Sequence, residues 1–271
     1  MFDAHHHLWD TSVRDYTWMN GPWADPLRGR FDLARYTGAA RPDGSIVVQA
    51  LHSAEETQEL LAVAEGPGPV AGVVGWTDLT APDVRDTLRR MPETLVGIRH
   101  QVQDEPDSAW LLRPEVRKGL AAVGEAGLVY DLLVTPRQAA SALEAVRALP
   151  GVAFVLDHAG KPGIAGGAWE PWANWIGSLA ALPNVTVKLS GLVTEAAPRW
   201  KPDDVLPYAR YVLDTFGPGR VMYGSDWPVC TLAASHDQVA ELAGAAVAGL
   251  TPGERDEVFG GTARRVYGVG G

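Results

Sequence analysis

The feature that most constrains the fold is the regular recurrence of short apolar segments along the 271 residues of the chain. Nearly all of them are followed by a stretch with the length and pattern of a helix. The segments predicted as strands lie at 2–7, 45–50, 70–76, 95–100, 128–134, 152–158, 185–190 and 221–226. Apolar strands that alternate with helices are typical of a parallel sheet covered on both faces. Eight such units in a chain of this length predict a closed (β/α)8 TIM barrel.

Helices between these strands are predicted from capping residues and apolar periodicity. They are expected at 53–65, 82–91, 114–126, 136–149, 169–182, 202–216, 235–250 and from 252 onward. No glycine-rich dinucleotide-binding fingerprint follows the first strand, which weighs against an open, doubly wound sheet. No linker divides the sequence, so we expect one domain over residues 1–271. The long segment Thr11–Pro42 has no obvious strand and is predicted to be a functional loop or lid.

The charge balance narrows the expected partners. With 23 Lys and Arg against 33 Asp and Glu, the formal net charge is −10. This balance disfavours nucleic acid or an anionic membrane, because both attract clustered cations. No apolar run approaches the roughly 20 residues of a membrane span. The single cysteine, Cys230, excludes an intramolecular disulfide and fits a reducing compartment. We expect a cytoplasmic protein that acts on a small molecule; the sequence leaves open whether it forms a homo-oligomer.

Polar side chains gather at the carboxyl ends of the predicted strands. In a parallel barrel these ends share the face on which catalytic groups lie. His5 and His7 on the first strand point to one side, because successive strand residues alternate, and could hold a metal or an oxygen-rich ligand. Asp226 at the end of the last predicted strand is a further candidate for the site, and the alternative for this residue is a helix N-cap or a structural anion. The other polar residues at strand ends are Gln49, Trp76, Arg99, His100, Tyr130, His158, Lys188 and Ser190.

Several motifs at these strand ends carry a family resemblance. They are His5-x-His7, Gly-Ile-Arg-His at 97–100, Leu-Asp-His-Ala-Gly-Lys-Pro at 156–162, Lys-Leu-Ser-Gly-Leu at 188–192 and Tyr-Gly-Ser-Asp-Trp-Pro at 223–228. As an ordered set over nearly the whole chain, they resemble the amidohydrolase superfamily, and within it the sugar-lactone hydrolases of the amidohydrolase 2 branch. The resemblance implies a hydrolase that opens the lactone of a sugar acid.

The resemblance also implies roles for individual residues. Lactone opening needs an activated water, a polarised carbonyl and an acid for the leaving alkoxide. Asp226 matches the general base of the family, and a carboxylate suits that task. The family's metal-ligand positions are matched by His5, His7, His158 and Asp226. Binuclear relatives carry a carboxylated Lys or a Glu on the fourth strand, where this chain has Arg99, so a binuclear centre is not expected. One zinc ion and no metal both remain open.

The remaining strand-end residues are assigned by the same resemblance. Arg99, His100 and His158 are candidates for catalysis, with Arg99 and His100 polarising the carbonyl or binding hydroxyl groups. Lys188 could reach the substrate or pair with Asp157. Residues expected to line the pocket are Gln49, Trp76, Tyr130 and Trp227.

Three other functions compete with lactone hydrolysis. A metal-dependent decarboxylase of an aromatic acid belongs to the same branch, and a lactone isomerase would use a similar site. A binding module without catalysis would be favoured if the polar groups were scattered rather than convergent. The sequence does not identify the lactone, because its stereochemistry depends on the loops Thr11–Pro42 and Gly163–Trp172.

Overall fold

Eight parallel strands form the centre of the molecule, as predicted. The computed structural model describes residues 1–270. In spatial order the strands are β1 (Phe2–His6), β4 (Gly44–Val48), β5 (Val70–Gly75), β6 (Leu95–His100), β7 (Val129–Leu132), β8 (Ala153–Leu156), β9 (Val185–Leu189) and β10 (Val221–Tyr223). Beyond the strands, the backbone of Asp226 donates to His5 and that of His7 donates to Trp227, which links the first and last strands. The prediction of a (β/α)8 barrel is confirmed.

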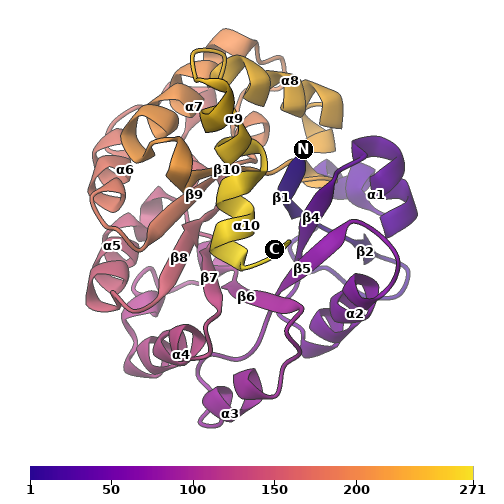
Figure 1. Cartoon of the computed structure of the whole chain (residues 1–271), viewed down its shortest axis with the longest axis vertical. Helices are drawn as coiled ribbons and strands as arrows, with labels where there is room; N and C mark the ends of the chain where they lie inside the picture. The colour runs from indigo at the N-terminus through magenta and orange to yellow at the C-terminus, as the bar shows by residue number, and fades with distance from the viewer. Residues whose placement is uncertain (271) are drawn as a thin grey trace.

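Most of the helices surround the strands in the order of the chain (Figure 1). They are α1 (Leu33–Ala40), α2 (Ala54–Glu65), α3 (Val84–Arg89), α4 (Pro114–Glu125), α5 (Ala139–Ala148), α6 (Trp172–Ala180), α7 (Pro202–Phe216), α8 (His236–Ala246), α9 (Pro252–Asp256) and α10 (Thr262–Tyr267). Ser53 caps α2 by accepting from the backbone of Glu56, and Ser235 caps α8 in the same way. Both capping residues lie where the sequence pattern predicted the start of a helix.

The segment after the first strand is more ordered than its sequence predicts. Strand β2 (Trp9–Asp10) pairs antiparallel with β3 (Arg30–Phe31), so the two ends of this loop are joined by a short ribbon. The indole of Trp9 donates to the carbonyl of Leu27 within it. Two-residue strands are too short to show a period in the sequence, which is why no strand was obvious in this segment.

The amino end of the barrel is closed by the carboxyl terminus. Helix α10 lies across the ring of strands in Figure 1. Its residues Ala263 and Tyr267, with Val269 beyond it, pack against the apolar floor of the barrel. That floor consists of Phe2, Ala4, Ile46, Val48, Val74, Val96, Val129, Val155 and Met222. The polar strand ends are thus left for the opposite face.

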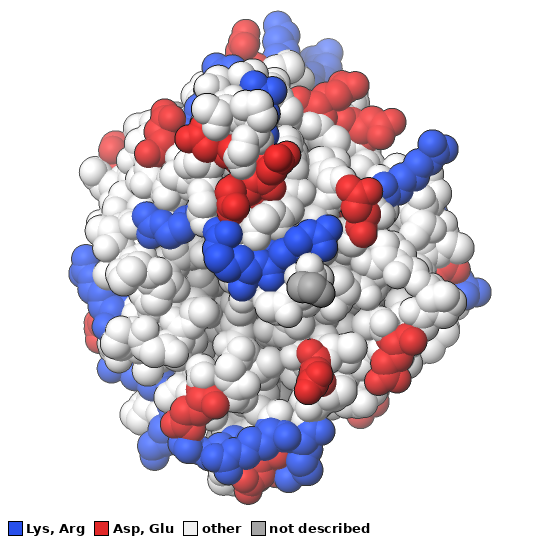
Figure 2. Space-filling model, in the orientation of Figure 1, with Lys and Arg blue, Asp and Glu red and all other residues white. Residues whose placement is uncertain are grey.

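The charged side chains on the surface and the apolar character of the helices can be compared with what the sequence predicts. On the face shown in Figure 2, acidic and basic side chains are both present, in separate small groups. Within residues 1–270, no helix has the length and apolar character needed to cross a membrane.

Candidate active site

Four strand ends bring the predicted reactive groups together. His5 lies on β1 and His7 directly follows that strand. Arg99 comes from β6, His158 from the turn after β8 and Asp226 from the turn after β10. His158 and Asp226 have left-handed backbones, with φ of 53° and 57°. Such residues are costly outside glycine and cluster where the surrounding structure holds a functional geometry. Both side chains lie beside His5: the ring centroid of His158 is 4.6 Å from that of His5, and Oδ1 of Asp226 is 3.8 Å from its Nε2.

One group is formed by His5, His7 and Asp226. The Nε2 atoms of the two histidines are 3.2 Å apart. Oδ1 of Asp226 lies 3.5 Å from Nε2 of His7 and 3.8 Å from Nε2 of His5. Both imidazoles are buried, as is the carboxylate. Three potential ligand atoms therefore converge on one point.

Hydrogen bonds set the orientation of the flanking imidazoles. Nδ1 of His7 lies 2.7 Å from the carbonyl oxygen of Val48, which can only accept, so Nδ1 carries the proton and Nε2 offers its lone pair to the group. Nδ1 of His158 bonds to the Ser190 hydroxyl at 2.9 Å. A Cβ at residue 191 would lie 2.5 Å from that nitrogen, and φ there is +64°, so only glycine fits beside His158.

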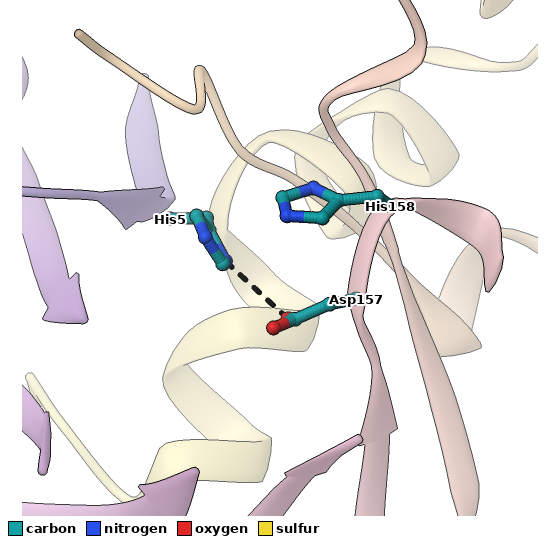
Figure 3. A group of neighbouring side chains, drawn as sticks. All are labelled: His5, Asp157 and His158. Carbon is teal, nitrogen blue, oxygen red and sulfur yellow. Dashed lines mark ion pairs between the residues drawn. The ribbon is translucent and has the colours of Figure 1, made fainter. Parts of the chain in front are cut away.

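A second group surrounds Asp157. Nη1 of Arg99 lies 3.1 Å from Oδ2 of Asp157, and Nζ of Lys188 lies 3.1 Å from Oδ1. Nδ1 of His5 is 3.3 Å from Oδ1, the ion pair drawn in Figure 3, where His158 lies beside the same carboxylate. Lys188 also pairs with Asp131, and its side chain is fully buried. Of its two expected roles, the structure shows pairing with Asp157.

Burial lowers the pKa values of the histidines in this site and raises that of Asp226, whereas nearby charges lower that of Asp157. Burial lowers the pKa of His7 to about 3 and of His158 to about 4, so both imidazoles are neutral near pH 7. Burial raises the pKa of Asp226, and the neighbouring His158 only partly offsets this. Burial alone would also raise the pKa of Asp157, but Lys188 and His5 outweigh it and hold that pKa well below its usual value.

The donor sets differ in their fit to a metal. His5, His7 and Asp226 place two imidazole nitrogens and a carboxylate oxygen within 4.8 Å of one another. Neutral imidazoles and a carboxylate without a Lys or Arg ion pair suit a divalent cation. His5, Asp157 and His158 are equally close, but Arg99 and Lys188 already neutralise that carboxylate. The first group fits a metal, with His158 at its edge.

A cavity of about 370 Å³ opens above these groups. His7, Arg99, His158 and Asp226 line its reactive end. Further residues that sequence reasoning did not select also line it: Trp18, Trp23, Ala50, Gln101, Gln103, Asp104, Leu133, Lys161, Thr194, Glu195, Val229 and Leu232. Lys161 stands inside the motif at 156–162, and Trp18 and Trp23 lie in the predicted functional loop Thr11–Pro42, two signals that could have found them.

Other expected site residues lie outside the lining of this cavity. Gln49 is buried behind Arg99, to whose carbonyl it donates at 3.1 Å. The Tyr130 side chain is fully buried in the barrel, and Trp227 packs against Phe31 and Tyr36. Gln49 therefore supports Arg99 from behind, whereas Tyr130 and Trp227 belong to the packing of the barrel and its loops.

His100 and Trp76 belong to a neighbouring cluster. Nε1 of Trp76 donates to Nδ1 of His100 at 3.2 Å, and Nε2 of His100 lies 2.8 Å from Glu105. The imidazole also stacks on Trp110, with ring centroids 4.1 Å apart. Both ring nitrogens of His100 are thus engaged, and neither it nor Trp76 lines the cavity.

Fold and site together define a (β/α)8-barrel enzyme whose histidines and carboxylates meet at the carboxyl ends of the strands. The chain belongs to the amidohydrolase family, whose model "Amidohydrolase" matches residues 2–269. It is 40% identical to an L-fucono-1,5-lactonase of Burkholderia ambifaria over 98% of this chain and 94% of the relative. It is 39% identical to an L-fucono-1,5-lactonase of Burkholderia multivorans, over 98% and 95%.

A solved structure supports the same conclusion. The crystal structure of an amidohydrolase from Burkholderia multivorans with bound zinc superimposes with a TM-score of 0.94. It shares 38% identity and covers 99% of both chains. Membership in the family and the barrel architecture are therefore confirmed.

Proposed function

We propose that this protein hydrolyses the lactone of a sugar acid, with L-fucono-1,5-lactone as its substrate. The observation that carries the proposal is the convergence of His7, Arg99, His158 and Asp226 on one cavity. It occurs in a chain about 40% identical, along nearly its whole length, to two proteins with that activity. These relatives favour lactone hydrolysis over decarboxylation of an aromatic acid.

Asp226 is the general base of the proposed reaction. No Lys or Arg lies within ion-pair distance of it in residues 1–270; its carboxylate instead lies close to the imidazoles of His5 and His7. Burial raises its pKa, which makes the ionised carboxylate a better proton acceptor than an exposed one. It takes a proton from water as the water oxygen attacks the ring carbonyl carbon, and returns that proton to the ring oxygen when the acyl bond breaks.

Arg99 and His158 stabilise the charge that develops on the carbonyl oxygen. Arg99 is held by Asp157 on one side and by Gln49 on the other, so its guanidinium is fixed at the base of the cavity. The Nδ1 of His158 is held by Ser190. Groups oriented before the reaction need no rearrangement when the negative charge forms, which is the main source of this kind of stabilisation.

His5, His7 and Asp226, with His158 at the edge, would hold a divalent cation, and zinc is our proposal for it. Such an ion would act as a Lewis acid toward the lactone carbonyl. Oδ1 of Asp226 faces the two histidines, which leaves its other oxygen for the proton of water. The zinc in the similar Burkholderia multivorans structure supports this choice of metal.

The test is a kinetic assay on a pair of enantiomers. Hydrolysis of L-fucono-1,5-lactone is followed with a pH indicator, and D-fucono-1,5-lactone serves as the matched control of equal size and intrinsic reactivity. We expect fast turnover of the L form and little of the D form. Equal rates, or no turnover of either, would contradict the proposed substrate. Chelation followed by zinc addition, with metal content measured alongside, tests the proposed cofactor.

We also propose that the protein works in the cytoplasm. This is supported by its single cysteine, Cys230, which is free and buried.

A further inference from the structure

A column of buried polar side chains runs along the barrel axis from the closed amino end to the candidate active site. Tyr267 of α10 donates its hydroxyl to Oδ1 of Asp131 at 2.8 Å. The other oxygen of Asp131 pairs with Lys188. The same ammonium bonds to Nδ1 of His5 at 3.0 Å. Tyr267 is thereby connected to a reactive imidazole through two intervening residues.

We propose that Tyr267 is a positioning residue, which through Asp131 and Lys188 fixes the orientation of the His5 imidazole. This inference rests on the proposed function, because it takes His5 as part of the reactive group. Tyr267 packs against the apolar floor of the barrel and does not line the cavity, so it acts only through other residues.

Two contacts of Tyr267 constrain Lys188. Its hydroxyl holds the carboxylate that pairs with the ammonium, and its ring centroid lies 5.6 Å from Nζ, within the range of a cation–π interaction. Lys188 has three donor hydrogens and three acceptors in reach: Asp131, Asp157 at 3.1 Å and His5. A flexible four-carbon side chain is thus held at a single position.

The position of Lys188 in turn determines that of His5. Nδ1 of His5 lies 3.0 Å from Nζ of Lys188 and 3.3 Å from Oδ1 of Asp157. The tautomer in which Nδ1 donates to Asp157 leaves the lone pair of Nε2 for a cation, and Lys188 then holds His5 through the carboxylate of Asp157, 3.1 Å from its Nζ. With Nδ1 anchored toward the barrel interior, Nε2 is directed at His7 and Asp226. Loss of the anchor would let the ring rotate away from the geometry that the reaction needs.

The charges explain why a tyrosine is used at the closed end. Arg99 and Lys188 balance Asp131 and Asp157, and the side chains of the two aspartates and the lysine are fully buried. Asp131 has only Lys188 as an ionic partner in residues 1–270. The neutral donor of Tyr267 satisfies its second oxygen without adding a third cation to a balanced network.

The test compares Tyr267→Phe with Tyr223→Phe. Both tyrosines are buried, but the Tyr223 hydroxyl has no hydrogen-bond partner in residues 1–270. For Tyr267→Phe we expect kcat to fall about tenfold with KM nearly unchanged, and zinc affinity measured by chelator competition to fall by a similar factor. Tyr223→Phe should retain wild-type values. A Tyr267→Phe protein with wild-type kcat and zinc affinity, even at a lower Tm, would overturn the proposal, as would equal losses in both variants.

A third readout is independent of activity and metal. The ring ¹⁵N signals of His5, identified by their loss in His5→Gln, should shift or broaden in Tyr267→Phe and in Asp131→Asn, but not in Tyr223→Phe. Unchanged His5 signals would overturn the proposal. If wild-type protein hydrolyses no lactone, the proposed function fails, yet the zinc and NMR measurements still decide the role of Tyr267. If Tyr267→Phe does not fold, Asp131→Asn provides the same comparison.

Discussion

Asp157 and Asp226 are two buried aspartates that face the same imidazole with opposite consequences. Oδ1 of Asp157 lies 3.3 Å from Nδ1 of His5, and Oδ1 of Asp226 lies 3.8 Å from its Nε2. Asp157 is neutralised by Arg99 and Lys188, whereas the basic side chains close to Asp226 within residues 1–270 are the histidines His5 and His7. The pKa of the first is lowered and that of the second is raised.

The difference shows that partners, rather than depth, decide what a buried carboxylate does. A carboxylate paired with two cations is a poor base and a poor metal ligand, because its charge is already used. One among neutral imidazoles keeps its charge available for a proton or a cation. Asp157 therefore organises the site, and Asp226 is the group we propose to react.

The largest effect is expected from Asp226→Asn. Since the amide cannot accept a proton from water, kcat should fall about 10²- to 10⁴-fold. The Tm should change little, because Asp226 anchors no buried cation. Steady-state kinetics and thermal melting check both expectations together. Retained turnover would remove Asp226 as the base.

Asp157→Asn should act mainly on stability. It leaves Arg99 and Lys188 with a single carboxylate between them, and breaking a buried ion pair costs about 3–5 kcal/mol. Denaturant unfolding measures the loss. Asp86→Asn is the control, because Asp86 pairs with Arg89 on the exposed surface of α3, where a pair contributes about 0–1 kcal/mol. Similar losses in the two variants would contradict the structural role of Asp157.

Two adjacent histidines, His6 and His7, test whether the group around Asp226 holds the metal. His7→Ala removes a nitrogen directed at Asp226 and should weaken zinc binding by about 100-fold, at the upper end of effects seen around metal sites. His6 points away from the group, stacks on Tyr36 and bonds to Ser45, so His6→Ala should keep zinc. Metal analysis after dialysis against a chelator distinguishes the two. Zinc loss in both variants would break the ligand assignment.

The smallest effect is the order in which the two carboxyls titrate in metal-free protein. Carboxyl ¹³C NMR should place the midpoint of Asp226 above 3.8 and that of Asp157 below it. Ionised Asp157 stabilises the fold above pH 3.8, and this contribution is lost as the pH falls through its lowered pKa. For Asp226, ionisation costs stability as the pH rises from 3.8 through its raised pKa. The reverse order would contradict the comparison.

Much of the architecture was predictable because it follows from local patterns. Each barrel strand was expected within a few residues of where it lies, and the helix at Pro202–Phe216 was predicted with its observed bounds. The ribbon of β2 and β3 was missed because its strands are two residues long. Apolar runs that must be buried on both faces leave a strong signal, whereas such short pairings leave none.

The site was predictable in composition but not in arrangement. His5, His7, His158, Arg99 and Asp226 do converge, since parallel strands end on one face. The sequence could not show that Gln49 and Tyr130 are enclosed behind the cavity, or that both nitrogens of His100 are engaged elsewhere. Whether a side chain at a strand end faces the cavity or is enclosed behind it depends on the neighbouring side chains and loops.

The sequence by itself determined the strand–helix alternation, and with it the barrel and the set of side chains at its open end. Only the tertiary structure decided which carboxylate is neutralised, which imidazole nitrogen faces the cavity and that Tyr267 reaches Asp131 across 136 positions of sequence. The physical reason is that strand periodicity is a short-range property of the chain. Charge pairing and hydrogen bonding depend on distances of a few ångströms between residues that folding alone brings together.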